Sequence, residues 1–462
     1  MIYFGLSVTT ILGLCVALSI SQRLKIVEAL GLAFLMGIGI QTFLMVCMDW
    51  VGIRLTATSA LTCSGLVIAG LCVSLYFRWA SVKEWLRYVS AFTRPKISWL
   101  WVLALLAIAV VVVMNVAKTM YYPTFDTDSV RGFNLIGKVV AHDGTLKNCG
   151  LYTDANYAEM RGSVSTMTYM PLTQLAYTYV YLLGAATSKI INALLFISFT
   201  LVFYGLMSRF ATHTLAAIAT FLTLITPEML GFSSMSGVNV IHAFYASLGI
   251  IFFATWYYKK IPSLLWIAAC MLMLNSWSRT EGIVFIGAAG CVFLWYSIKT
   301  KQYKTLLLLA GCGLLPIIFW NVFLKVNHME GVQSVVAKLF WDGEKVSIIM
   351  KEMWILFKSN TFYGITFVAF IIVLASNGWM IFKKYDQVVT LILIGLSWLF
   401  YTILIYQVDY IWDSLENVMR YSYKRFLFSF VPLLWFYIAS SHNVKWLFDK
   451  VDAFLFPLKK QA

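Results

Sequence analysis

Residues 99–132, WLWVLALLAIAVVVVMNVAKTMYYPTFDTDSVRG, place a long apolar run directly before two aspartates. The run from 99 to 117 carries no charged side chain, and ~20 mostly apolar residues are what a helix needs to cross a bilayer. Asp126 and Asp128 would then lie just outside the membrane. The stretch therefore predicts a membrane protein, and it raises the question of what two carboxylates do at the membrane surface.

Similar apolar runs recur along almost the whole chain. The 462 residues are 61% hydrophobic and only 12% charged, with a mean hydropathy of +0.81, which excludes an ordinary soluble domain. We expect an all-α polytopic membrane protein forming one membrane-embedded domain over residues 1–462. About thirteen spans are predicted; they cover residues 2–20, 28–49, 55–77, 99–117, 189–207, 213–228, 238–257, 262–277, 282–298, 305–324, 361–382, 388–407 and 426–441.

One apolar segment does not fit as a crossing. Counting LTQLAYTYVYLLG, residues 172–184, as a full span would invert the side on which every later basic loop lies. We therefore expect a partial or re-entrant helix, which is possible at membrane depth only where protein covers its ends.

The net charge of +15 is concentrated in the loops that alternate to one side, including residues 78–96, 299–304 and the tail 445–460. The positive-inside rule makes that side cytoplasmic. Three long loops, about 118–171, 325–360 and 408–425, then face the periplasm or exterior of a cytoplasmic (inner) membrane. Nucleic acid is excluded as a partner because no basic stretch with interleaved aromatics lies on a soluble domain.

The cysteines give no sign of a cross-linked or metal-bound fold. Seven of the eight fall inside apolar runs, where cysteine behaves as a small hydrophobe, and only Cys149 lies in an external loop. We expect neither a disulfide framework nor a cysteine metal cluster.

The acidic loop leads into a helix with one apolar face. In SVRGFNLIGKVVAHDG, residues 129–144, apolar side chains recur at three- and four-residue spacing. Asp128 stands at the expected helix N-terminus, where a carboxylate can serve as a cap. Two interpretations stay open: a cap with a solvated neighbour, or a general base or metal ligand. The expected apolar face comprises Val130, Phe133, Ile136, Gly137 and Val140.

An apolar helix, a loop with paired acids, a helix ending in DGTL and a proline before another helix together resemble the first external loop of the GT-C superfamily. These integral-membrane glycosyltransferases use polyprenyl-phosphate sugars; they include protein O-mannosyltransferases, oligosaccharyltransferases and the lipid A aminoarabinose transferase. The resemblance implies a GT-C-like bundle with a partial helix and short external helices. It also implies that an acid of this loop is the catalytic base or holds a metal, with Asp128 the best match and Asp126 the second.

Two other stretches are similar to the family: SWSRTEG, residues 276–282, and YKRFLFSFVP, residues 423–432. They suggest basic side chains for the donor phosphate, although an Arg279–Glu281 ion pair or snorkelling to lipid headgroups would explain them structurally. One departure argues against a multi-ligand metal site, because PEMLGFSSMSGVNVIHAF, residues 227–244, places Asn239 and His242 where several relatives have an acid. The candidate phosphate ligands are Arg279, Arg425, Lys424 and Arg420, and the supporting residues are Glu281, Asn239 and His242.

The resemblance thus implies a glycosyltransferase that moves a sugar from a polyprenyl-phosphate donor to a hydroxyl of an envelope glycan, lipid or protein. The aspartate would take the acceptor's proton and the guanidinium groups would hold the departing phosphate. No cofactor is required, and a divalent metal stays open. The alternatives are a lipid or glycan transporter or flippase, which would place ionisable residues near the bilayer midplane, and an envelope glycan polymerase or ligase.

Overall fold

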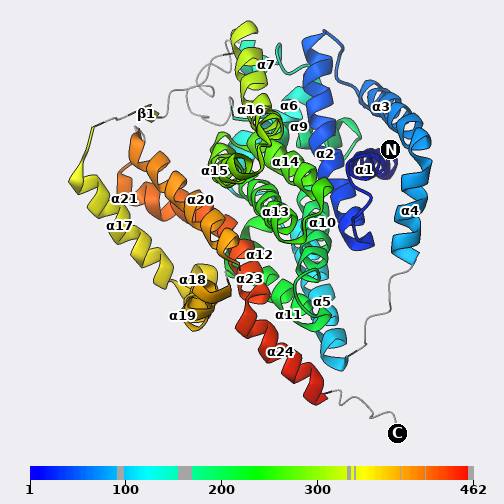
Figure 1. The fold of residues 1–462 in the computed structure, drawn as a ribbon. Coiled ribbons are helices and arrows are strands. Elements are labelled where there is room, and N and C mark those ends of the chain that lie inside the picture. Colours follow the sequence, from blue (N-terminus) through cyan, green and yellow to red (C-terminus); the bar gives the residue numbers. More distant parts are fainter. Residues whose placement is uncertain are drawn as a thin grey trace.

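The computed structural model describes residues 1–90, 98–153, 169–329, 335–337, 340–384, 387–410 and 413–455. In this part of the chain, nine helices are long and apolar enough to cross a membrane, which confirms the all-α polytopic class (Figure 1). They are α1 (Ile2–Ile20), α2 (Ile26–Trp50), α3 (Ala57–Phe77), α5 (Trp99–Tyr121), α10 (Ile190–Met207), α13 (Val238–Lys259), α15 (Ile283–Thr300) with the preceding η4 (Thr280–Gly282), α16 (Tyr303–Val326) and α20 (Val388–Gln407).

Two bent helix pairs raise the number of possible spans in the described residues to eleven. One pair is α11 (His213–Leu224) with α12 (Pro227–Ser233), bent by 67°. The other pair consists of the run Leu415–Ser440 and α24 (His442–Leu455), and the bend between them is 62°. The predicted spans 262–277 and 361–382 form α14 (Pro262–Ser278) and α19 (Thr366–Lys384), whose apolar parts are shorter than the nine helices above. The count of thirteen is therefore not confirmed.

The remaining elements are short. The segment 172–184 contains α9 (Leu172–Leu182), an 11-residue helix that is too short to cross a bilayer and is almost entirely buried, as expected for a partial helix. The strands β1 (Val335–Ala337) and β2 (Val408–Tyr410) pair antiparallel, which adds a small ladder to the predicted all-α fold. The other short helices are α4 (Trp79–Ser90), η1 (Asp128–Phe133), α6 (Asn134–Asp143), α7 (Gly150–Thr153), α17 (Gly343–Lys358), α18 (Asn360–Tyr363), α21 (Leu415–Val418), η5 (Met419–Tyr423), α22 (Lys424–Leu427), η6 (Phe428–Phe430) and α23 (Val431–Ser440).

The bundle is centred on α13, which is buried along nearly its whole length, whereas most apolar side chains of α3, α5 and α16 are exposed or only partly buried. Glycines allow the tightest approach, between α1 and α2. A side chain at Gly13 would lie 1.9 Å from the Ala33 carbonyl oxygen, and one at Gly37 would lie 2.0 Å from that of Thr9. Small residues at such crossings let helix backbones pack directly, which stabilises association where the lipid gives no hydrophobic advantage.

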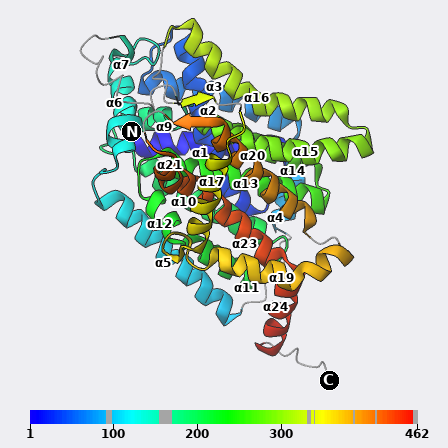
Figure 2. The ribbon, with the colours of Figure 1, turned by 90° about the vertical axis from the view of Figure 1, so that its left-hand side faces the viewer.

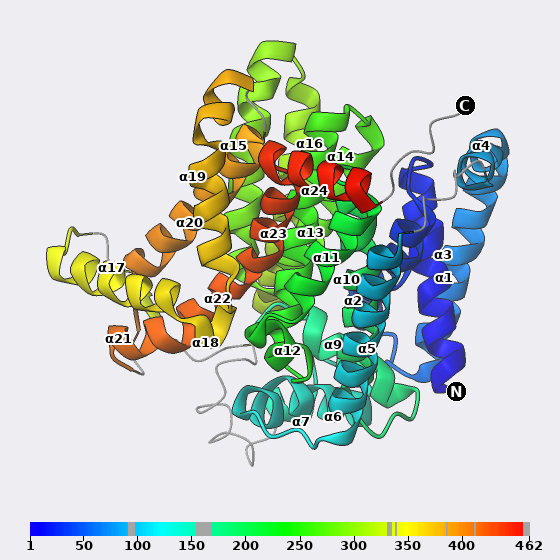
Figure 3. The same cartoon turned by 90° about the horizontal axis from the view of Figure 1, so that it is seen from below.

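The short elements divide between the two ends of the bundle. Figure 3 shows α6, α7, α12, α18 and α21 at one end, and α4, α24 and the C-terminus at the other. Figure 2 likewise places α7 and α24 at opposite ends. The acidic first loop and the basic segment 78–90 are therefore separated as the charge pattern predicts. Residues 154–168 of that loop, and 330–334 and 338–339 of the second, lie outside the described residues.

Together with the positive-inside rule, this separation predicts that the end with α6 faces the exterior and the end with α4 faces the cytoplasm. A cysteine replacing His142, whose side chain is 88% exposed at the end of α6, should react with a membrane-impermeant maleimide added outside intact cells. A cysteine replacing Lys83 on α4 should react only after permeabilisation. The parent chain, with its exposed Cys72 and Cys291, supplies the background. The reverse labelling pattern would contradict the external placement of Asp128.

Candidate functional site

The first long loop, which was predicted to be external, is tied to the bundle at its far end. In the DGTL stretch, Gly144 ends α6 with a left-handed backbone (φ 73°), and its carbonyl accepts from the Leu55 N–H at 2.7 Å. Asp49, in the last turn of α2, accepts the Thr145 hydroxyl at 2.7 Å and the Lys147 N–H at 2.9 Å. The helix preceding DGTL is therefore fixed relative to the membrane spans.

The apolar face of α6 packs as predicted, with one exception. Phe133, Ile136, Gly137 and Val140 are buried, but Val130 is exposed. The exception arises because residues 128–133 form the π-helical turn η1, in which Gly132 leaves helical geometry (φ −112°, ψ −107°). The wider turn changes which side chains face inward. Such π-helical segments are frequent at functional sites.

The two aspartates have different partners, and of the two interpretations left open for Asp128, the helix cap does not apply. Asp126 is the capping residue: its Oδ2 accepts from the Ser129 N–H at 3.2 Å and the Ser129 hydroxyl at 3.1 Å. The cap moves two residues upstream because the Asp126 carbonyl already accepts from the Val130 N–H at 2.8 Å, so the helical turn begins there. Asp128 makes no capping hydrogen bond, and its carboxylate is available for another partner.

That partner is Arg425. Its Nη1 donates to Asp128 Oδ2 at 2.7 Å, joining side chains 297 positions apart in the sequence. The neighbouring Lys424 places its Nζ 3.1 Å from Oε1 of Glu228, at the start of α12. Lys424 and Arg425 thus begin α22 with two adjacent cations, each facing a carboxylate from a different part of the chain.

Arg279 belongs to a second polar centre. Its guanidinium donates to both carboxylate oxygens of Glu281, at 2.5 and 3.2 Å, and to Oδ1 of Asn239 at 3.0 Å. The Tyr169 ring lies 6.0 Å from the guanidinium carbon. The structural ion pair left open by the sequence is therefore present, and Asn239 completes it.

His242 stands behind this second centre. It is buried, and Asn275 Nδ2 lies 2.9 Å from both its Nδ1 and its carbonyl oxygen. The His242 ring contacts the rings of Phe285 and Phe426, at centroid distances of 5.9 and 6.3 Å. Because Phe426 directly follows Arg425, His242 contacts the residue next to one cation of the first polar centre.

Arg420 is engaged elsewhere. Its Nε and Nη2 donate to the two oxygens of Glu352 on α17, both at 2.9 Å. These hydrogen bonds hold the pKa of the Glu352 carboxyl below its ordinary value against the opposing effect of burial. Arg420 thus ties α17 to η5, and this contact helps to fix the helix that carries Lys424 and Arg425.

The described residues do not form a multi-ligand metal centre. Among them, no three histidine, cysteine, aspartate or glutamate side chains converge where they could hold an ion. Asp126 is occupied by Ser129 and Asp128 by Arg425, so neither presents a free chelating pair.

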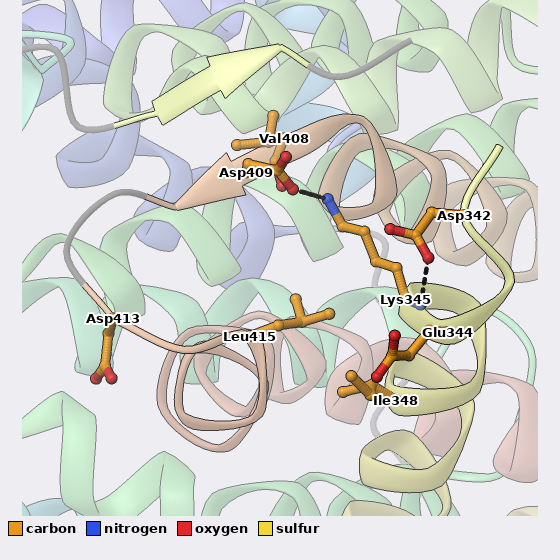
Figure 4. A pocket seen from close by; sticks show the side chains of 8 residues that line it. All are labelled: Asp342, Glu344, Lys345, Ile348, Val408, Asp409, Asp413 and Leu415. Atoms are coloured by element: carbon orange, nitrogen blue, oxygen red, sulfur yellow. Dashed lines mark hydrogen bonds and ion pairs between the residues drawn. The ribbon is translucent and has the colours of Figure 1, made fainter. Parts of the chain in front are cut away.

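The other two long loops, which were predicted to be external, meet in a polar pocket of about 240 Å³ (Figure 4). Its acids have structural contacts: Asp342 caps α17 through the Lys345 N–H at 3.1 Å, and Lys345 Nζ contacts Asp409 Oδ1 at 2.5 Å. None of the predicted site residues lines this pocket; its lining is Asp342, Glu344, Lys345, Ile348, Val408, Asp409, Asp413 and Leu415.

An apolar cavity of about 250 Å³ lies between α14, α15 and α16, with Phe253 contributed by α13. Its lining is mostly aliphatic and glycine, with Phe253 and Phe293 its aromatic side chains. Ile283, which directly follows the η4 turn carrying Glu281, is part of the wall. The cavity offers space for a hydrocarbon chain next to the second polar centre.

Glu228 is a site residue that the sequence analysis missed. Glu228 lies in PEMLGFSSMSGVNVIHAF, the stretch in which Asn239 and His242 occupy the place where the resemblance led us to expect an acid. Its position directly after Pro227, at a helix N-terminus, was an available signal. Its contact with Lys424 depends on the fold. Comparison of the chain with protein-family models, with curated proteins and with solved structures finds no match.

Proposed function

We propose that this protein is a membrane glycosyltransferase that moves a sugar from a polyprenyl-phosphate donor to a hydroxyl group at the external face of the cytoplasmic membrane. The observation that carries the proposal is the pairing of Asp128 with Arg425. It brings a carboxylate able to accept a proton within 2.7 Å of a guanidinium able to hold a phosphate. Both side chains remain partly exposed, Asp128 by 42% and Arg425 by 30%, so substrates can reach them.

The proposed reaction is a single displacement at the anomeric carbon. The acceptor oxygen forms a bond to this carbon while the bond between the carbon and the phosphate oxygen breaks. The phosphate leaves with the bonding electron pair on its lipid carrier, and Arg425 and Lys424 stabilise the charge that develops there. Asp128 takes the proton of the acceptor hydroxyl.

The distribution of ionisable residues supports an enzyme over a transporter or flippase. In the nine described spans, acidic, basic and histidine side chains lie near the helix ends, as with Glu28 and Asp49 in α2 or His242 and Lys259 in α13. A transport pathway would need such groups near the bilayer midplane. The alternative of an envelope glycan polymerase or ligase uses the same donor chemistry and differs in its acceptor.

The assay for this proposal is the release of polyprenyl phosphate from a panel of polyprenyl-phosphate sugars, in native membranes that supply the acceptor. The wild-type chain should release lipid phosphate from at least one donor. Arg425→Gln should lower this rate by about 10²- to 10³-fold, as expected for loss of one charge-stabilising donor.

Arg131→Gln is the matched control, because Arg131 is an exposed arginine of η1. It should retain nearly the wild-type rate. If Arg425→Gln also transfers sugar at the wild-type rate, Arg425 is not the phosphate ligand. If no donor in the panel releases lipid phosphate with the wild-type chain, the proposed function fails.

A further inference from the structure

The two ion pairs around Lys424 and Arg425 differ in how firmly they are held. Asp128 and Arg425 share one hydrogen bond through Nη1, and no other hydrogen bond of the Arg425 side chain is found in the described residues. Glu228 and Lys424 are more buried, 11% and 19% exposed, and the Lys424 ammonium also lies 4.3 Å from the Phe362 ring centroid. The Asp128–Arg425 pair is therefore the one that can open.

A single-contact, partly exposed ion pair is weakly held, because water competes for both charges. A phosphate oxygen pair can engage a guanidinium in bidentate fashion, which a single carboxylate oxygen does not. The Lys424 ammonium has three N–H donors and uses one for Glu228, so it can contact a phosphate without leaving its carboxylate.

We propose that Asp128 and Glu228 are the resting counter-ions of a lipid-phosphate site formed by Lys424 and Arg425, and that an arriving lipid-linked phosphate displaces Asp128 from Arg425. Lys424 stays anchored to Glu228 during this exchange. The Asp126–Ser129 hydrogen bonds hold the turn, so only the side chains of Asp128 and Arg425 need to move.

The exchange has a consequence that rests on the proposed function. In the resting state, Oδ2 of Asp128 accepts a hydrogen bond from Arg425. When the phosphate takes over Arg425, that oxygen is released beside the bound donor. Donor binding would then leave both carboxylate oxygens of Asp128 available to the acceptor hydroxyl, next to the sugar that this hydroxyl attacks.

The displacement can be tested by binding, without any transfer reaction. The probe is polyprenyl phosphate without a sugar, titrated into the purified full chain in nanodiscs. Asp128→Asn should bind it about two- to fivefold more tightly than wild type, because Arg425 then faces a neutral amide in place of a competing carboxylate. Arg425→Gln should bind it about ten- to a hundredfold more weakly, through loss of the charged hydrogen bonds.

Asp126→Asn is the matched control, since it makes the same charge change two residues away without touching Arg425. It should leave the affinity unchanged. In the double variant Asp128→Asn, Arg425→Gln, the affinity should equal that of Arg425→Gln alone, because no guanidinium remains to be released. Melting curves without ligand establish that each variant is folded.

Unchanged or weaker binding by Asp128→Asn would overturn the displacement. Inorganic phosphate and phosphatidic acid vesicles are the comparison ligands. If Asp128→Asn raises the affinity for inorganic phosphate as much as the affinity for polyprenyl phosphate, the assignment to a lipid carrier is overturned. If the predicted binding pattern holds while no donor sugar is ever transferred, the phosphate site stands and the proposed glycosyltransferase function falls.

Discussion

We expect replacement of Asp128 by Asn to lower the rate of sugar transfer by about 10²- to 10⁴-fold, the range typical of a lost general base. Asparagine keeps the size of the side chain and can still accept a hydrogen bond from Arg425, but it cannot take the proton of the acceptor hydroxyl. The measurement is the release of polyprenyl phosphate at saturating donor, compared with wild type at equal protein in the membrane.

Asp126→Asn separates this catalytic effect from a structural one. Asparagine caps helices about as well as aspartate, and Asp126 is the residue whose side chain accepts from Ser129, so this change should cost much less. If Asp126→Asn proves to be the more damaging change, the roles of the two aspartates are reversed. Wild-type rates in both single variants and in the double variant would show that neither carboxylate is catalytic.

Replacement of Glu28 by Gln should destabilise the fold by about 3–5 kcal/mol, because it leaves a buried guanidinium without its counter-charge. Glu28 is 0% exposed and Arg209 7%, and Arg209 donates to both carboxylate oxygens, at 2.6 and 2.5 Å. The Lys25 N–H also donates to Glu28, at 2.8 Å. The pair fastens the start of α2 to the end of α10. The measurement is the thermal unfolding midpoint of the purified protein.

The matched control is the Arg23–Glu84 pair, which has the same chemistry on the surface. Its N–O distance is 2.7 Å, but the side chains are 56% and 60% exposed. Glu84→Gln should change stability by less than about 1 kcal/mol, since water already solvates both charges. The double variant Glu28→Gln, Arg209→Met should recover part of the loss. Equal midpoints for Glu28→Gln and Glu84→Gln would show that the buried pair contributes no more than the surface one.

The local sequence correctly predicted those elements that depend only on the side chains of neighbouring residues. The apolar run at 99–117 became α5, and the LTQLAYTYVYLLG segment became the short buried α9. The cap lies at Asp126 and not at Asp128, the position that the sequence had left open, because the helical turn begins two residues upstream, ahead of the π-helical turn η1. A pattern of three- and four-residue spacing assumes ordinary helical geometry and does not anticipate such a turn.

By itself, the sequence determined that the chain is a helical membrane protein, because transfer of ~20 apolar residues into lipid is a property of each segment and needs no partner. It also placed the candidate charges at the ends of those segments. Only the tertiary structure decided their partners: Asp128 with Arg425, Glu228 with Lys424, Arg420 with Glu352 and Arg279 with Glu281 and Asn239. Most of these contacts join residues far apart in the chain, so they depend on how the helices pack, and helix packing follows side-chain shape, which hydropathy does not record.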